Sequence, residues 1–310
     1  MKLFDEIKNY IENEKTFNEE LAIEIANFQL KNNPFYKAYA EKVGIKKIKK
    51  IQDIPFLPVE FFKNQRIFSF EKADGFFMSS GTGGERSKVF YNKKTLELYE
   101  ISALKSFPFK DKKIYSLIPP FSIAENSSLS FMLDIFSRNL NLEYLNKESF
   151  EIDEKIFFRI LKEKTEDNSV LFLTSLQLFK LSSLKKESIT KKFTIIETGG
   201  YKATKKIYRR KKLYKFAKKV FVNSEFFSEY GMAELFSQFY TVSKNRDYTF
   251  SHYNYIFTKE GKGLLKVFDF ANLGTVSSLY IPDFIVKRGN EFDVKGRLTS
   301  EIRGCGYVFK

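Results

Sequence analysis

Hydroxyl and glycine residues gather in one short segment, where they could hold phosphate groups. The segment consists of Ser79, Ser80, Gly81, Thr82 and Gly83. Glycines let the backbone approach a phosphate and turn its N–H groups inward, and the hydroxyls donate further hydrogen bonds. Lys88 follows closely and could neutralise phosphate charge. The segment lacks the Gly-Lys-Ser/Thr spacing of the usual P-loop, and a Gly/Ser/Thr loop is by itself also typical of a plain turn.

Two further segments could hold a planar ligand and a metal ion. Tyr230-Gly231-Met232-Ala233-Glu234 has a glycine beside an aromatic ring, so the chain could pass flat against a planar group. The Glu234 carboxylate is an oxygen ligand of the kind that Mg²⁺ prefers. Gly199 and Gly200 follow a predicted strand, at the edge where α/β folds bind ligands.

The carboxyl-terminal part adds an acid, an arginine and a thiol. Asp283 could accept hydrogen bonds from both hydroxyls of a ribose, and Arg297 could reach a ribose or a phosphate. Each could equally be an ordinary surface residue. Cys305 lies two residues after Arg303, whose charge would favour the nucleophilic thiolate. A free cysteine also often packs as a small buried hydrophobe, so both interpretations stay open.

The hydrophobic pattern predicts the elements that position these residues. Residues 1–50 repeat apolar side chains at helical spacing. Between residues 75 and 245, β-rich runs such as 114–120, 170–175, 193–200 and 219–226 alternate with helical stretches, which is typical of an α/β domain with parallel strand pairs. The tail is rich in strands and turns, with SSLYIP and DFIVKRGN as separate runs. We therefore expect an α/β fold with one unit at 1–245 and a β-rich subdomain at 246–310.

Composition excludes several classes of protein. The 310 residues contain one cysteine and one histidine, His252, too few for a disulfide framework or a soft-metal site. No run is apolar enough to span a membrane, and the charged, periodic start predicts a helix rather than a signal peptide, so we expect a cytoplasmic protein. The net charge of +15 invites a nucleic-acid interpretation, but no nucleic-acid module accompanies it. We expect a basic surface and no specific nucleic-acid partner.

The order of these motifs along the chain resembles that of the adenylate-forming superfamily, which includes acyl-CoA synthetases and luciferases. Within the superfamily, the chain looks most like the acyl-protein synthetase of bacterial luminescence. The likeness is carried by IPFLPVEFFK (54–63), Gly-Gly-Tyr-Lys (199–202), FDFANL (268–273) and GRLTSEIRGCGYVF (296–309), and it covers about residues 30–310. It implies a large adenylate-forming domain that uses ATP and Mg²⁺ to activate a carboxylic acid, with a fatty acid as the expected substrate.

The resemblance also implies a role for each candidate residue. Ser79, Ser80, Gly81, Thr82 and Gly83 would hold the β- and γ-phosphates of ATP. Gly199, Gly200, Tyr230 and Gly231 would enclose the adenine, Asp283 would bind the ribose hydroxyls, and Arg297 the ribose or α-phosphate. Glu234 would bind Mg²⁺, and Lys202 or Lys88 would supply a cation. Cys305 would accept the acyl group as a thioester and pass it to a partner protein such as a reductase.

Several residues depart from the superfamily pattern. The phosphate loop reads Gly-Thr-Gly-Gly instead of Gly-Thr-Thr-Gly, Ala233 replaces a usual threonine, and Asp283 lies in an unusual Ile-Pro-Asp-Phe context. The chain also ends soon after Gly296-Arg297, so we expect the small C-terminal domain of acyl-CoA synthetases to be absent. Two alternatives remain: an acyl-CoA ligase of the phenylacetate type, and a catalytically lapsed protein that binds a nucleotide or nucleic acid.

Overall fold

The structure is a computed structural model that describes residues 2–80, 85–184, 187–199, 210–242 and 247–298. Its helices are α1 (Lys2–Asn13), α2 (Glu19–Asn32), α3 (Pro34–Lys42), α4 (Lys93–Ser106), α5 (Ser128–Asn139), α6 (Glu154–Glu163), α7 (Ser175–Ser182) and α8 (Arg210–Ala217), with 3-10 turns η1 (Ile51–Asp53) and η2 (Val59–Lys63). Its strands are β1 (Leu57–Pro58), β2 (Gly75–Met78), β3 (Lys88–Tyr91), β4 (Ile114–Ser116), β5 (Leu142–Tyr144), β6 (Ser169–Thr174), β7 (Phe193–Thr198), β8 (Glu225–Tyr230), β9 (Phe239–Tyr240), β10 (Tyr248–Thr249), β11 (Asn254–Ile256), β12 (Gly261–Asp269), β13 (Ser278–Arg288) and β14 (Glu291–Arg297).

One large sheet combines a parallel and an antiparallel part. Its strand order is β11-β12-β13-β14-β10-β9-β8-β7-β6-β4-β5, with β1 paired to β13. Strands β5, β4, β6, β7 and β8 are parallel, whereas β8 to β11 pair antiparallel through β9, β10, β14, β13 and β12. The predicted α/β fold with a β-rich C-terminal part is confirmed.

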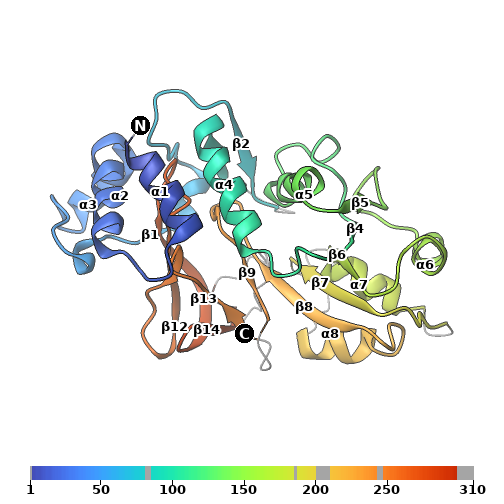
Figure 1. Cartoon of the computed structure of the whole chain (residues 1–310). Coiled ribbons are helices and arrows are strands. Elements are labelled where there is room, and N and C mark those ends of the chain that lie inside the picture. The colour runs from blue at the N-terminus through green and yellow to red at the C-terminus, as the bar shows by residue number, and fades with distance from the viewer. Residues whose placement is uncertain (1, 81–84, 185–186, 200–209, 243–246, 299–310) are drawn as a thin grey trace.

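Helices cover the two parts of the sheet separately. In Figure 1 the blue helices α1, α2 and α3 lie beside β12, β13 and β14, and α6, α7 and α8 lie around the parallel strands. Buried Gln29 of α2 fastens the first group, because its Nε2 donates to the Asn272 carbonyl at 2.8 Å and to Ser277 Oγ at 3.1 Å. Strand β7 is buried at every position, as expected of a parallel strand covered on both faces.

Two strands differ from their predicted boundaries. The run 219–226 is not one strand, because residues 218–224 turn after α8 and β8 begins only at Glu225. The runs SSLYIP and DFIVKRGN, expected as separate strands, belong to the single strand β13. Pro282 is tolerated there because it lies at a bulge: Ile281 pairs with Leu265, and Phe284 with the adjacent Leu264.

The domain boundary near residue 245 stays a prediction. Strands β9 and β10 lie on its two sides and pair through Tyr240 and Thr249, within the same sheet. Residues 243–246 lie outside the described residues. The two predicted units are therefore continuous in hydrogen bonding, and this continuity brings residues 297 and 230 to one place.

Candidate functional site

A cavity of about 330 Å³ lies where β7 and β8 end, next to the last residue of β14. Seven of the residues that the sequence predicts as ligand-binding line it: Ser79, Ser80, Gly199, Tyr230, Gly231, Glu234 and Arg297. These residues come from segments up to 218 positions apart, which the sheet brings together. The other lining residues are Met78, Tyr99, Ser127, Ser128, Leu129, Met132, Phe150, Glu151, Thr174, Leu176, Thr198, Glu229, Met232, Ala233 and Gln238.

The Glu234 carboxylate is buried at the cavity without a hydrogen-bond partner. Its side chain is 1% exposed, and neither Oε1 nor Oε2 has a partner among the residues that the structure describes. Burial raises the pKa of Glu234, and the nearby Ser87 hydroxyl and the Arg297 charge partly offset this. Ser87 Oγ itself lacks hydrogen-bond geometry to any described group. A buried carboxylate left in this state costs free energy that a bound cation or donor would offset.

Two residues of the FDFANL motif (268–273) form hydrogen bonds with the backbone of the segment that carries Glu234. Asp269 accepts hydrogen bonds from the backbone N–H groups of Phe236 at 2.7 Å and Ser237 at 3.0 Å. Asn272 Nδ2 donates to the Glu234 carbonyl at 2.9 Å. Burial raises the pKa of Asp269 to about 6, although these hydrogen bonds favour its charged form. The two polar residues of the motif therefore fix the backbone on either side of Glu234.

Arg297 forms a buried pair with Asp283 across strands β13 and β14. Arg297 Nε and Nη2 donate to the two oxygens of Asp283 at 2.5 and 2.7 Å, and the Tyr230 hydroxyl donates to Asp283 Oδ2 at 2.7 Å. Asp283 is fully buried and does not line the cavity, so its carboxylate is occupied by protein groups rather than directed at a ligand. Arg297 Nη1, by contrast, has no partner within the described parts of the chain. Asp283 thus orients the arginine, whose remaining N–H groups are available to an anion.

Hydrogen bonds join Ser79, at the start of the predicted phosphate loop, to Ser87, which follows the loop. Ser79 N donates to the Ser87 carbonyl at 3.0 Å, and Ser87 N donates to Ser79 Oγ at 2.9 Å. Arg86 Nε donates to the Ser79 carbonyl at 2.6 Å. Lys88 is exposed and its Nζ lies 5.5 Å from the centre of the Phe76 ring, outside the residues that line the cavity. Three predicted members of the loop lie outside the described residues: Gly81, Thr82 and Gly83.

Only the first glycine of the predicted Gly-Gly pair can be placed. Gly199 has φ +75°, a left-handed conformation that favours glycine, and its carbonyl accepts from Ser175 Oγ at 2.7 Å. It therefore turns the chain sharply at the end of β7. The second glycine, Gly200, lies outside the described residues. So do two other predicted site residues, Lys202 and the expected acyl acceptor Cys305.

The cavity lining also contains polar residues that the sequence analysis did not single out, among them Tyr99, Glu229 and Gln238. Glu229 ends β8 beside Tyr230 and accepts a hydrogen bond from Thr198 Oγ1 on β7. Burial raises the pKa of Glu229 to about 7, with the nearby Glu197 charge adding to the rise. A Cβ at Gly231 would lie 2.3 Å from Glu229 Oε1, so the glycine leaves room for this carboxylate. The one available signal was the position of Glu229 directly before the Tyr-Gly motif.

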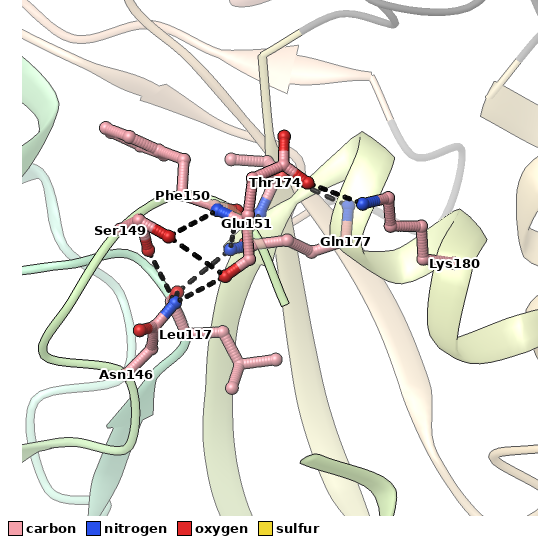
Figure 2. A network of polar contacts seen from close by, with 8 residues as sticks. All are labelled: Leu117, Asn146, Ser149, Phe150, Glu151, Thr174, Gln177 and Lys180. Carbon is pink, nitrogen blue, oxygen red and sulfur yellow. Dashed lines mark hydrogen bonds and ion pairs between the residues drawn. The ribbon is translucent and has the colours of Figure 1, made fainter. Parts of the chain in front are cut away.

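Phe150 and Glu151, which line one rim of the cavity, belong to a loop that a network of polar contacts holds in place (Figure 2). Asn146 Nδ2 donates to the carbonyls of Leu117 at 3.2 Å, Ser149 at 2.5 Å and Glu151 at 3.2 Å. Gln177 of α7 donates to the Phe150 carbonyl at 3.0 Å, and Lys180 pairs with Glu151 at 2.7 Å. These bonds hold the backbone, so the half-exposed Phe150 ring is presented at the cavity.

Other sequence expectations concern regions away from the cavity. His252 packs edge-on against Tyr10 and Tyr253, with centroids 5.0 and 5.1 Å apart, and burial lowers its pKa. In the described parts of the chain, no helix combines the length and apolar character needed to cross a bilayer. The same residues contain no group of three or more His, Cys, Asp or Glu side chains arranged to hold a metal.

The fold has clear counterparts among solved structures, although no family model and no curated protein matches the chain. A 2-hydroxyisobutyryl-CoA ligase in complex with 2-HIB-AMP and CoA superposes with a TM-score of 0.65 at 9% identity, over 90% of this chain and 67% of that chain. The luciferase-like enzyme of the mealworm Zophobas morio gives a TM-score of 0.52 at 11% identity, over 80% of this chain and 63% of that one.

A third match is the N-terminal domain of FACL13 from Mycobacterium tuberculosis, with a TM-score of 0.52 at 11% identity, over 74% of this chain and 62% of that one. The chain therefore shares its fold with these three proteins. At such low identities the likeness is one of fold, so the activity must be argued from the cavity itself. The finer resemblance to the acyl-protein synthetase of bacterial luminescence stays a prediction.

Proposed function

We propose that the protein activates a carboxylic acid with ATP, forming an acyl-adenylate and pyrophosphate. The observation that carries this proposal is the pair of unsatisfied groups at one cavity: the Glu234 carboxylate and Arg297 Nη1. Buried polar atoms without partners are rare in folded proteins and often mark a ligand site. A carboxylate and a guanidinium that share one cavity fit a ligand that brings both a cation and an anion, as a magnesium nucleotide does.

The chemistry requires positioning and charge neutralisation more than a reactive side chain. A carboxylate oxygen of the acid attacks the α-phosphorus of ATP, and the bond from that phosphorus to the bridging oxygen of the pyrophosphate breaks. Arg297, oriented by Asp283, neutralises charge that develops on the phosphate oxygens. Tyr230 and Gly199 border the same cavity, where the adenine would lie.

Glu234 fits the magnesium ion that ATP brings with it. Magnesium in nucleotide sites is held by one or two carboxylates together with phosphate oxygens and water, so a single buried carboxylate suffices. Both Glu234 oxygens lack protein partners among the described residues. When bound, the ion would supply charge neutralisation at the phosphates. Lys202 or Lys88 would add a further cation; the position of Lys88 beside Phe76 makes Lys202 the better candidate.

An exchange assay tests the proposal directly. Labelled pyrophosphate is incubated with the protein, ATP, Mg²⁺ and a panel of carboxylic acids, and label entering ATP is measured. We expect exchange that depends on one class of acid. If ATP stabilises the protein against unfolding but no acid supports exchange, the protein is a nucleotide binder and the activity is wrong.

The proposed acyl acceptor is Cys305, whose thiolate would attack the acyl carbon and release AMP. With the active acid, ATP and Mg²⁺, we expect a covalent acyl-protein adduct that neutral hydroxylamine removes. Cys305→Ser should keep wild-type exchange but lose the labile adduct, because activation does not involve the thiol. Wild-type exchange without any adduct would favour CoA or a partner protein as acceptor. A fatty acid as substrate and a reductase as the protein that receives the acyl group are further parts of the same proposal.

A further inference from the structure

Gln238 presents a fourth unsatisfied polar atom at the cavity, on a third residue, and phosphate oxygens, which are acceptors themselves, cannot satisfy it. The residue precedes β9, lines the cavity and is 4% exposed. Its Oε1 is buried and has no hydrogen-bond partner among the residues that the structure describes. A neutral amide oxygen accepts hydrogen bonds, so a donor on a bound ligand would satisfy it.

The orientation of this amide is fixed by Tyr99. The Tyr99 hydroxyl donates its single proton to the Ser128 carbonyl at 3.0 Å. Its oxygen can then only accept, and it accepts from Gln238 Nε2 at 3.4 Å. Exchanging the amide nitrogen and oxygen would place two acceptors against each other. Gln238 must therefore turn its NH₂ group to Tyr99 and leave its oxygen to a ligand.

A second acceptor lies on the same wall. Glu229 Oε1 stands over the backbone of Gly231, and Gln238 Cγ lies 3.5 Å from the position that a Gly231 Cβ would take. Both side chains therefore share the space above this glycine. The apolar residues of the cavity lining include Met78, Leu129, Met132, Leu176 and Met232. Polar acceptors set in an apolar wall are suited to a ligand with one donor on a carbon framework.

From this geometry we infer that the activated acid carries a hydrogen-bond donor, a hydroxyl or an amine, which Gln238 accepts beside Glu229. The inference rests on the proposed function and narrows its substrate class. An unsubstituted fatty acyl chain would leave Gln238 Oε1 buried and unpaired. Sites built to pair a substrate hydroxyl or amine reject the analogue without it by factors on the order of 10² to 10⁵.

Pyrophosphate exchange with matched acids tests the inference. The panel pairs butyrate, hexanoate, benzoate and phenylacetate with their hydroxy- and amino-substituted counterparts. We expect at least one substituted acid to exceed its parent in kcat/KM by about 100-fold or more. Exchange that is equal or faster with the unsubstituted acids overturns the inference and leaves the proposed function standing. Absence of exchange with every acid overturns both.

Two variants assign the effect to Gln238. Gln238→Leu should reduce kcat/KM for the substituted acid by about 100-fold, with little change for its parent or in KM for ATP. Ser130→Ala removes another buried hydroxyl without a described partner, outside the cavity lining, and should leave the preference intact. The adenine amino group is the competing donor. If Gln238→Leu changes the ratio of ATP to inosine triphosphate use but not the ratio between acids, Gln238 binds adenine and the inference is wrong.

Discussion

The two walls of the cavity differ in the charge of their polar groups. One wall consists of Glu234, Arg297 and the Asp283 behind it, all buried and all ionisable. The other consists of Tyr99, Gln238 and Glu229, of which the first two are neutral and the third has a pKa raised to about 7. The first wall suits the charged phosphates and metal of a nucleotide. The second suits a neutral polar substituent.

Under the proposed function, this difference separates the part of the cavity that every acid needs from the part that can vary with the acid. Every acid that is activated with ATP meets the same phosphates, so the charged wall serves any substrate. The neutral wall meets the part of the acid that differs from one substrate to another. Loss of a charged group should therefore stop the reaction, whereas changes in the neutral wall should redirect or modulate it.

The largest effect is expected at Glu234. Glu234→Gln keeps the size of the side chain but removes the charge that would hold the metal, so acid-dependent pyrophosphate exchange should fall by about 10³-fold or more. Folding should be preserved, because the backbone here is held by Asp269 and Asn272. Thermal unfolding monitored beside the exchange assay separates the two effects. Wild-type exchange in this variant would remove Glu234 from the metal site.

Breaking the Asp283–Arg297 pair should act on both stability and ATP use. Asp283→Asn leaves the nearly buried guanidinium without its counter-charge, which costs about 3–5 kcal/mol for a buried pair. KM for ATP should also rise, since Arg297 loses its orientation. Glu97→Gln is the matched surface control: its 2.7 Å pair with Lys8 is exposed to solvent, so its loss should leave the free energy of unfolding nearly unchanged. Equal unfolding free energies for the two variants would contradict a structural role for the pair.

Most residues of the charged wall could be predicted from the sequence as candidate site residues, whereas those of the neutral wall could not. Glu234, Arg297 and Ser79 belong to motifs whose residue types match phosphate and metal chemistry, and the alternation of strands and helices predicted the parallel sheet that carries them. The partner of Arg297 could not be foreseen. Asp283 faces Arg297 because of the register between β13 and β14, near a bulge that follows from long-range pairing.

Gln238 shows why such residues escape sequence reasoning. Its free oxygen depends on Tyr99, which lies 139 residues earlier, on helix α4. A lone glutamine has no recognisable spacing, and only the three-dimensional arrangement reveals that its oxygen lacks a partner. The prediction of a strand at 219–226 was wrong for a similar reason. Its β-rich composition indicated a strand, but the chain turns after α8, so β8 begins six residues later than predicted.

Glu229 should give the protein a pH-dependent stability. Its pKa in the folded protein is about 7, above the ordinary 4.5, so the folded state holds the proton more tightly. The resulting stabilisation is complete below pH 4.5 and is lost as pH rises through 7. Glu229→Gln should reduce this decrease in the free energy of unfolding by about 3 kcal/mol at most. Urea unfolding at a series of pH values measures it, and an unchanged pH profile would show that Glu229 does not titrate there.

The smallest effect is expected at the rim loop that carries Phe150, where the hydrogen bonds at risk hold the backbone and involve no charged group. Asn146→Ala removes the hydrogen bonds that its Nδ2 donates to the carbonyls of Leu117, Ser149 and Glu151 and the one that its Oδ1 accepts from Glu148 N. The cost should be about 1–2 kcal/mol, because Leu117 and Phe150 keep their bonds from Gln177. The charged wall is untouched, so KM for ATP should stay constant. KM for the acid should rise by about three- to tenfold as the Phe150 ring loses its fixed position. Lys162→Met, which breaks an exposed ion pair with Glu187 outside the cavity lining, is the control and should leave both constants near wild type. A rise in KM for ATP that matches the rise for the acid would mean that the rim serves both ligands, and the division between the two walls would not extend to it.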